Sequence, residues 1–259
     1  LVLARPQTTN KWQNSEIEGI DIMLAIDVST SMLAEDLKPN RLEAAKDVAA
    51  EFINGRPNDN IGITLFAGET FTQCPLTVDH AVLLDMIHNI KCGLITDGTA
   101  VGMGIANAVT RLKDSKAKSK VIILLTDGTN NKGDISPMTA AEIAKSFGIR
   151  VYTIGVGTNG MAPYPYPVGN TVQYVSMPVE IDEKTLTEIA GTTDGNYFRA
   201  TSNSKLKEVY EEIDKLEKTK LNVKEYSKRD EEYHWFALAA FLCVLLEVLL
   251  RNSVLKKIP

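Results

Sequence analysis

The sequence predicts an α/β fold: a doubly wound, mostly parallel sheet that is flanked by helices on both faces. Four short runs are rich in Ile, Val and Leu with little alternation, at residues 20–26, 61–67, 121–125 and 151–156. Such runs are typical of strands that are covered on both faces. Stretches with the apolar spacing of helices lie between them, and this alternation favours right-handed crossovers within one sheet.

The remaining elements follow in chain order. Apolar stripes predict helices over residues 42–53, 82–90, 105–112 and 143–147, and Gly148 ends the last of them. Residues 71–77 are expected to form an edge strand that ends at Pro75. A Pro- and Gly-rich stretch after Gly157 leads into a hairpin that includes residues 172–175. Asp182 is expected to cap a short helix that ends at Gly191, before an edge strand at 196–200 and a final amphipathic helix at 206–216.

Composition excludes some classes of function. The chain has 259 residues, of which 44% are apolar, and its formal net charge is -5. There is no basic footprint for nucleic acid, so we expect no nucleic-acid partner. Three cysteines are too few for a disulfide framework. Cys74 and Cys92 are expected to be free thiols, although a pair remains an alternative if the domain faces an oxidising compartment.

Three groups of polar residues are expected where buried strands end. The first group is Asp-x-Ser-x-Ser, in which alternate side chains can aim at one point as the chain leaves the sheet. Alone, such a motif is most often a turn or helix cap. Together the groups supply two carboxylates and three hydroxyls at one edge of the sheet. The expected metal ligands are Asp27, Ser29, Ser31, Thr99 and Asp127.

An all-oxygen set indicates a hard divalent cation. Mg²⁺ is the expected ion and Mn²⁺ or Ca²⁺ are alternatives, whereas Zn²⁺ usually takes His or Cys. Two carboxylates leave residual positive charge on the ion, which can therefore accept an Asp or Glu from a protein partner. We expect Met32, Phe71 and Tyr164 to form an apolar rim that contacts this partner.

The five ligands resemble the metal-ion-dependent adhesion site (MIDAS) of von Willebrand factor A (VWA) domains, and the order of elements matches over residues 20–216. A second resemblance is narrower. Ala-Arg-Pro-Gln at residues 4–7, Asp-Val-Ser-x-Ser-Met at 27–32, Phe-Thr-Gln-Cys-Pro-Leu-Thr at 71–77 and a C-terminal apolar segment are similar to the Bat-type aerotolerance membrane proteins of bacteria.

These resemblances imply a protein-binding module that is not an enzyme. Ser29, Ser31 and Thr99 would coordinate the cation, while Asp27 and Asp127 would hold it directly or through water. The Bat-type resemblance implies a complex with other Bat-type membrane proteins, a functional link to a MoxR-type AAA+ ATPase, and a role in stress or oxygen tolerance.

The C-terminal region predicts a membrane anchor. Residues 235–250 are almost continuously apolar, and Val254 and Leu255 extend the run towards the roughly 20 residues that a spanning helix needs. We therefore expect a transmembrane helix at 233–255, preceded by a charged stalk at 217–232 and followed by a basic tail at 256–259. A soluble buried helix is the weaker alternative. Glu247 either faces another helix or snorkels towards Arg251.

The N-terminal end also indicates attachment to a membrane. Residues 1–7 read as the end of a truncated membrane helix, which the Bat-type resemblance also implies, or alternatively as an unrelated tail; residues 8–19 are the linker. The expected location is the bacterial inner membrane. Arg251, Lys256 and Lys257 favour a cytoplasmic tail and hence a periplasmic domain. Basic residues between 220 and 229 weigh against this orientation.

Two other functions compete with the binding module. A metal-dependent hydrolase or phosphatase would use the same ion to activate water, but no accompanying base is visible. A purely structural domain would leave the site empty. Gly155-x-Gly157-x-x-Gly160 matches a dinucleotide fingerprint, yet the Pro-rich stretch after it cannot begin the helix that would hold a pyrophosphate.

Overall fold

The computed structural model describes residues 7–8, 19–158, 160–168, 171–222, 230–231 and 233–253. The chain divides into two compact units, Ile17–Leu221 on one hand and Leu1–Glu16 with Asn222–Pro259 on the other. Some predicted segments lie outside the described residues: most of the N-terminal helix end, most of the linker, part of the stalk and the whole basic tail.

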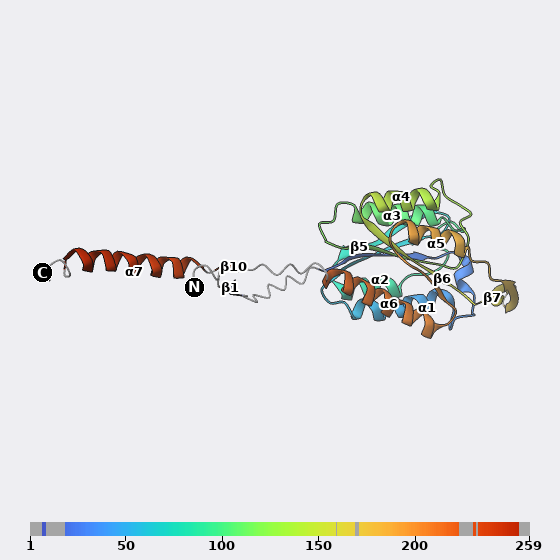
Figure 1. The fold of residues 1–259 in the computed structure, drawn as a ribbon. Helices are drawn as coiled ribbons and strands as arrows, with labels where there is room; N and C mark the ends of the chain where they lie inside the picture. The colour runs from blue at the N-terminus through green and yellow to red at the C-terminus, as the bar shows by residue number, and fades with distance from the viewer. Residues whose placement is uncertain are drawn as a thin grey trace. The chain divides into compact units, whose positions relative to one another are not determined.

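The larger unit contains a six-stranded sheet, which runs through the middle of this unit in Figure 1. Five strands are parallel, and β4 runs antiparallel at one edge. The predicted doubly wound, mostly parallel sheet is confirmed. In spatial order its strands are β4 (Thr70–Thr77), β3 (Asn60–Phe66), β2 (Asp21–Asp27), β5 (Lys120–Thr126), β6 (Ile149–Val156) and β9 (Tyr197–Ala200).

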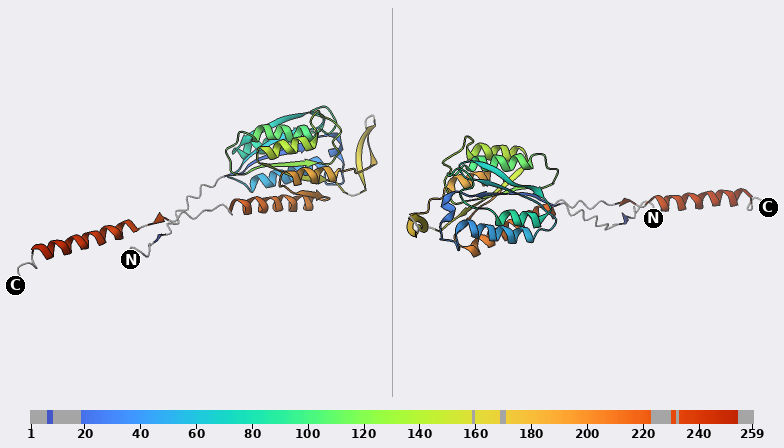
Figure 2. Two further views of the ribbon diagram at one scale, coloured as in Figure 1. Left: turned by 45° about the horizontal axis from the view of Figure 1, so that its top comes forward. Right: turned by 180° about the vertical axis from the view of Figure 1, so that it is seen from behind.

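Helices cover both faces of this sheet (Figures 1 and 2). The apolar residues of the central strands point alternately into two separate cores, because successive side chains of a strand face opposite ways. One core packs against α1 (Arg41–Asn54), α2 (His80–His88) and α6 (Asn203–Asn222). The other packs against α3 (Val101–Leu112), α4 (Pro137–Ser146) and α5 (Glu183–Thr192).

The strand order places a topological switch point between β2 and β5. From β2 the chain continues to β3 and β4 on one side, whereas β5 leads to β6 and β9 on the other. The two central strands are parallel neighbours, with Ile26 opposite Leu125. Crevices that bind ligands form at the carboxyl ends of strands at such a point. Asp27 ends β2 and Asp127 follows β5, so both predicted carboxylates lie at this position.

Two expectations for the edge segments need correction. Pro75 does not end β4, which continues to Thr77; instead the register between β3 and β4 shifts around it, as Cys74 opposes Ile63 and Thr77 opposes Ile61. An edge strand accommodates the missing N–H of proline at such an irregularity. The Pro-rich stretch is itself a strand, β7 (Met161–Val168), which pairs antiparallel with β8 (Thr171–Pro178).

The final helix of the larger unit is longer than expected. It reaches Asn222, and Glu217 is buried within it. The glutamate accepts hydrogen bonds from Arg150, from the Tyr152 hydroxyl at 2.5 Å and from the Ser119 hydroxyl at 2.8 Å. The first residues of the predicted stalk are therefore part of the folded domain.

The smaller unit contains a two-stranded antiparallel sheet and a helix. Gln7–Thr8 (β1) pairs with Asp230–Glu231 (β10), and α7 spans Tyr233–Ser253. The prediction of a helix in this region is confirmed. No helix of the described residues, however, is long and apolar enough to cross a membrane.

Candidate metal centre

The site begins where β2 ends. Asp27 is the last residue of that strand, and Ser29 remains extended before a short 3₁₀ helix, η2 (Thr30–Leu33). The tight turn brings the two serine side chains together, with 2.9 Å between their Oγ atoms. Asp27 and Ser29 lie two residues apart on extended backbone, so their side chains point the same way, as predicted. Ser31 reaches them through the 3₁₀ turn rather than through the predicted extended alternation.

The second carboxylate arrives from β5. The hydroxyl of Ser31 donates to Oδ1 of Asp127 at 2.7 Å, which joins the η2 turn to the end of β5. Asp27 accepts hydrogen bonds from the backbone N–H of Ser29 at 2.9 Å and from the hydroxyl of Thr126 at 2.6 Å. Both carboxylates are almost completely buried. Each carboxylate is therefore held by a hydroxyl from the other loop, Asp27 by Thr126 and Asp127 by Ser31.

Thr99 completes the predicted set from the loop before α3. A Cβ atom at Gly128 would lie 3.2 Å from the hydroxyl oxygen of Thr99, so this oxygen approaches the backbone that follows Asp127. The backbone N–H of Thr99 donates to the side chain of Asn131 at 2.9 Å, which fixes the loop. Gly98 has a φ of 128°, which favours glycine at this turn. The fold therefore brings all five predicted residues to one edge of the sheet.

Burial changes the acidity of the two carboxylates. Burial, followed by the negative charge of Asp127, raises the pKa of Asp27 to about 7. Burial also raises the pKa of Asp127, although hydrogen bonds from Arg41 and Ser31 oppose the shift. A buried carboxylate without a balancing charge takes up a proton readily. The two aspartates therefore favour the arrival of a cation that would restore their charge balance.

Arg41 is a residue of the site that the sequence analysis missed. It is the first residue of α1, and one of its terminal nitrogens donates to Oδ2 of Asp127 at 2.7 Å. Its other donors bind both carboxylate oxygens of Asp36, each at 2.7 Å. All three side chains are nearly buried. Arg41 thus neutralises part of the charge on Asp127 and leaves Oδ1 directed at Ser31.

Asp36 continues this network towards the β7–β8 hairpin. Its Oδ2 accepts from the backbone N–H of Thr158 at 2.8 Å and from the Thr158 hydroxyl at 3.1 Å. The neighbouring Glu35 donates its backbone N–H to the carbonyl of Pro163 at 2.9 Å. The segment between η2 and α1 therefore connects the base of the hairpin to Asp127 through a short chain of direct contacts.

The predicted apolar rim is partly wrong. Met32 is fully buried and belongs to the core beneath the site, because the 3₁₀ turn rotates it inwards. It cannot contact a partner. Phe71 is half-buried and packs against the same core, and Tyr164 is half-buried on the hairpin. Their role in partner binding stays a prediction. Cys74 and Cys92 are free thiols, as expected.

The donor set fits a hard divalent cation. Hydroxyl and carboxylate oxygens are the ligands that Mg²⁺, Mn²⁺ and Ca²⁺ prefer. The residues that would hold the ion are Ser29, Ser31 and Thr99, with the two aspartates bound directly or through water. A cluster of three or more His, Cys, Asp or Glu residues, which other metal sites use, is absent from the part of the chain that the structure describes.

Comparison with known proteins agrees with this geometry. Residues 21–212 match the profile of the von Willebrand factor type A domain. The chain belongs to the VWA family. A UPF0353 protein of Mycolicibacterium paratuberculosis is 32% identical to 73% of this chain. The chain spans 58% of that relative's length.

Two solved structures from Bacteroides are also similar. BatB of Bacteroides thetaiotaomicron, described as a conserved hypothetical protein, matches 77% of this chain and 100% of its own with 34% identity and a TM-score of 0.68. An aerotolerance-related membrane protein of Bacteroides fragilis matches 76% of this chain and 100% of its own, with 34% identity and a TM-score of 0.66. The predicted resemblance to VWA and Bat-type proteins is confirmed. The match over residues 21–212 falls within the larger unit, Ile17–Leu221, which contains both hydrophobic cores, so this unit is expected to fold as a domain.

Proposed function

We propose that this chain is a membrane-anchored VWA module that binds an acidic side chain of a protein partner through a divalent cation. The observation that carries the proposal is the convergence of the hydroxyls of Ser29, Ser31 and Thr99 with the buried carboxylates of Asp27 and Asp127 at the switch point of the sheet. Mg²⁺ is the proposed ion, with Mn²⁺ or Ca²⁺ as alternatives.

The contacts of Arg41 support the proposal that the partner supplies an acidic side chain. Its guanidinium already balances part of the charge of Asp127, and the three hydroxyl ligands are neutral. A divalent ion in this site would therefore keep more positive charge than it would if both carboxylates were free to neutralise it. Hard cations bind further oxygen ligands when their charge and coordination are incomplete. An Asp or Glu from another protein is the natural ligand for the remaining position.

Anchoring and assembly follow from the resemblance to Bat-type proteins. We propose that residues 233–255, which include α7, attach the chain to the bacterial inner membrane, and that the VWA domain lies in the periplasm. Support comes from the apolar composition of residues 235–250 and from the description of the Bacteroides fragilis relative as a membrane protein. The same likeness supports a complex with other Bat-type proteins, a link to a MoxR-type AAA+ ATPase, and a role in stress or oxygen tolerance.

Hydrolysis by the same ion remains the alternative. It would need a base beside the metal, and two of the histidines have other surroundings. His80 Nε2 lies 3.0 Å from the backbone oxygen of Asp59, and His88 Nδ1 lies 2.9 Å from that of Leu84 on its own helix. Since no specific contact favours catalysis, we propose a binding function without enzymatic activity.

The test is metal-dependent capture of the partner. The domain would be immobilised and exposed to a detergent extract of the source bacterium's membranes, with Mg²⁺ or with EDTA. We expect a specific set of proteins that is lost in EDTA and with Thr99→Ala. Thr110→Ala is the matched control, because that hydroxyl lies on the exposed face of α3 and bonds only to its own helix at Ala106. Proteins retained equally under all conditions would refute a metal-mediated interface.

A further inference from the structure

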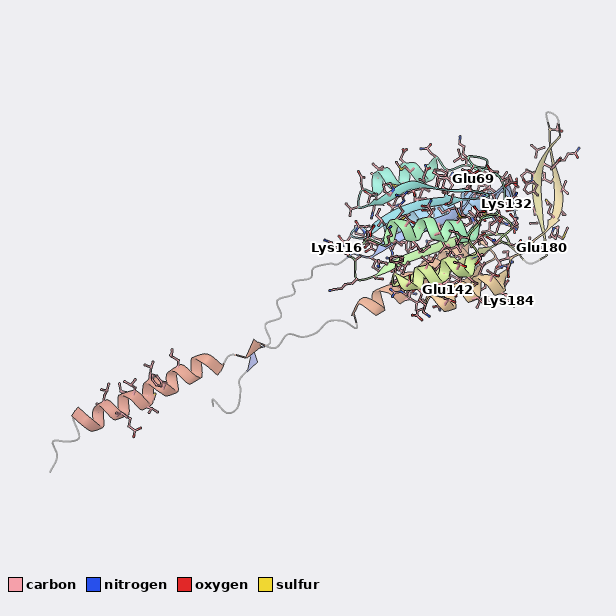
Figure 3. All side chains as sticks on the ribbon, turned by 90° about the horizontal axis from the view of Figure 1, so that it is seen from above. Glu69, Lys116, Lys132, Glu142, Glu180 and Lys184 are labelled. Atoms are coloured by element: carbon pink, nitrogen blue, oxygen red, sulfur yellow. The ribbon has the colours of Figure 1, made fainter. Side chains whose placement is uncertain are left out.

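The β7–β8 hairpin has two different edges. It projects beyond the helices at the end of the domain that carries the metal centre (Figures 2 and 3). Its outer β7 edge is closed by three prolines at alternate positions, which have no N–H to offer a further strand. The Pro163 carbonyl on that edge already accepts a hydrogen bond from Glu35.

The register shows which backbone groups of β8 face outwards. Val179 donates to the carbonyl of Gly160 at 2.8 Å, and these residues oppose each other in the register of the hairpin, so they occupy a hydrogen-bonded position. Bonded and non-bonded pairs alternate in an antiparallel ladder. Pro163, Pro165 and Pro167 therefore occupy non-bonded pairs, and their partners present N–H and C=O groups away from β7. Those partners are Ser176, Tyr174 and Val172.

The outer edge of β8 lacks the features that protect edge strands. Natural edges carry charges, prolines or bulges that prevent pairing with another chain. All eight residues of β8 are exposed, none of them is charged, and its one proline is the last residue. Val172 is 57% and Tyr174 is 60% exposed. Within the described residues no strand pairs with this edge.

We propose that β8 pairs with β8 of a second copy of this chain, so that the two hairpins form a continuous four-stranded antiparallel sheet. A two-fold axis at Tyr174 would place Tyr174 opposite its equivalent and Val172 opposite Ser176 of the second copy. Each of these facing pairs exchanges two hydrogen bonds, which satisfies the outward N–H and C=O groups of all three residues.

Charge selects this occupant over an unrelated chain. Self-pairing requires that no like charges oppose each other, and an uncharged strand meets this condition along its whole length. A partner strand that is recognised through its charges would find no opposite charge on β8. A single strand pair buries less than the roughly 1,200–2,000 Å² of a stable interface, so the dimer should dissociate on dilution.

Sedimentation velocity of the domain, residues 17–221, tests the proposal. Between about 1 µM and about 1 mM, where weak association is populated, we expect a shift from monomer to dimer that EDTA does not change. Tyr174→Pro removes the outward N–H while the hairpin tolerates it, as it tolerates Pro165 at the opposing position. This variant should weaken dimerisation roughly a hundredfold. Circular dichroism would verify that it is folded.

Tyr174→Ala is the matched control, because it removes the ring but keeps the N–H. It should dimerise within about tenfold of the unmodified domain. Equal loss with Ala and Pro would mean that association depends on the Tyr174 side chain, through its ring or its hydroxyl bond to Glu35 Oε1 at 3.0 Å, and not on the N–H, and would overturn strand pairing. So would a dimer that survives Tyr174→Pro or disappears in EDTA. A monomer at every concentration would also overturn self-pairing and leave the edge to another protein, without any bearing on the metal centre.

Discussion

Replacing Arg41 should destabilise the metal-free domain and at the same time strengthen metal binding. The side chain is 4% exposed, and its partners Asp36 and Asp127 are 2% and 0% exposed. Arg41→Met would leave two buried carboxylates without their cation. Breaking a buried ion pair in this way costs about 3–5 kcal/mol. Because the three groups are almost inaccessible, solvent screening reduces this cost little.

The affinity for the metal ion should change in the opposite direction, because Arg41→Met removes a positive charge near the site. A guanidinium about 6 Å from a divalent ion repels it by roughly 1.4 kcal/mol at an effective dielectric constant of 80, and by roughly 5.5 kcal/mol at 20. Even the lower figure corresponds to about a tenfold change in affinity. Arg41→Met should therefore bind Mg²⁺ at least tenfold more tightly than the unmodified domain, provided that it is folded.

Urea denaturation with and without Mg²⁺ gives both quantities. Arg56→Met is the control, since Arg56 is 2% exposed and pairs with Asp59 and Asp214 without contacting the metal centre. It should lower the free energy of unfolding but leave the increment due to Mg²⁺ unchanged. An Arg41→Met domain that is as stable as the original, or whose Mg²⁺ increment does not grow, would refute this account of the charge balance.

Three further predictions concern acidity, the helix α6 and one glycine. The pKa of Asp27 is raised to about 7, so between about pH 4 and 7 the folded domain holds a proton that the unfolded chain has lost. In EDTA the free energy of unfolding should therefore fall as pH rises through this range. The Mg²⁺ affinity measured by calorimetry should weaken by up to about tenfold per pH unit below 7. Glu217→Ala should lower the free energy of unfolding by about 3 kcal/mol in urea, whereas Glu208→Ala, with an exposed side chain, should change it by less than about 0.5 kcal/mol. Gly98→Ala should cost about 1–3 kcal/mol and weaken Mg²⁺ binding, since its Cβ would lie 2.6 Å from Lys132 Cγ; an unchanged melting temperature would contradict the strained turn.

The five candidate ligands were predictable because of where they stand in the sequence. Buried parallel strands leave a strong signal of continuous apolar residues, and the carboxyl ends of such strands meet at one edge. Asp27 and Asp127 follow two of these runs directly. Ser29 and Ser31 follow Asp27 within four residues, and Thr99 precedes a helix. No long-range contact had to be known to expect them together.

Arg41 escaped prediction because its contacts depend on tertiary structure. Asn40 before it is an ordinary helix cap, which accepts a hydrogen bond from Glu43 N–H at 2.8 Å. A signal was nevertheless present. A positive charge in the first turn of a helix is disfavoured by the helix dipole, so an arginine there indicates nearby carboxylates. Asp36, five residues earlier, is one of them.

The other differences from the predictions lie in local patterns that are compatible with more than one structure. Met32 follows a ligand serine and was expected at the surface, but a 3₁₀ turn has a different period from a strand and directs it into the core. The alternating prolines of β7 have the period of a strand with one blocked edge. Glu217 lies four residues after Ile213 on the buried stripe of α6, where a charge indicates a buried partner, here Arg150.

Calorimetric titration of the VWA domain with Mg²⁺ and Mn²⁺ tests the metal centre most directly. The unmodified domain should bind one ion, and Asp27→Asn should abolish binding while circular dichroism stays nearly the same. Asp97→Asn is the matched control at the same rim, because Asp97 accepts hydrogen bonds from Thr30 but is not one of the five ligands. It should bind within about tenfold of the unmodified domain. Undiminished affinity in Asp27→Asn, or no binding by the unmodified domain, would contradict the metal centre described above.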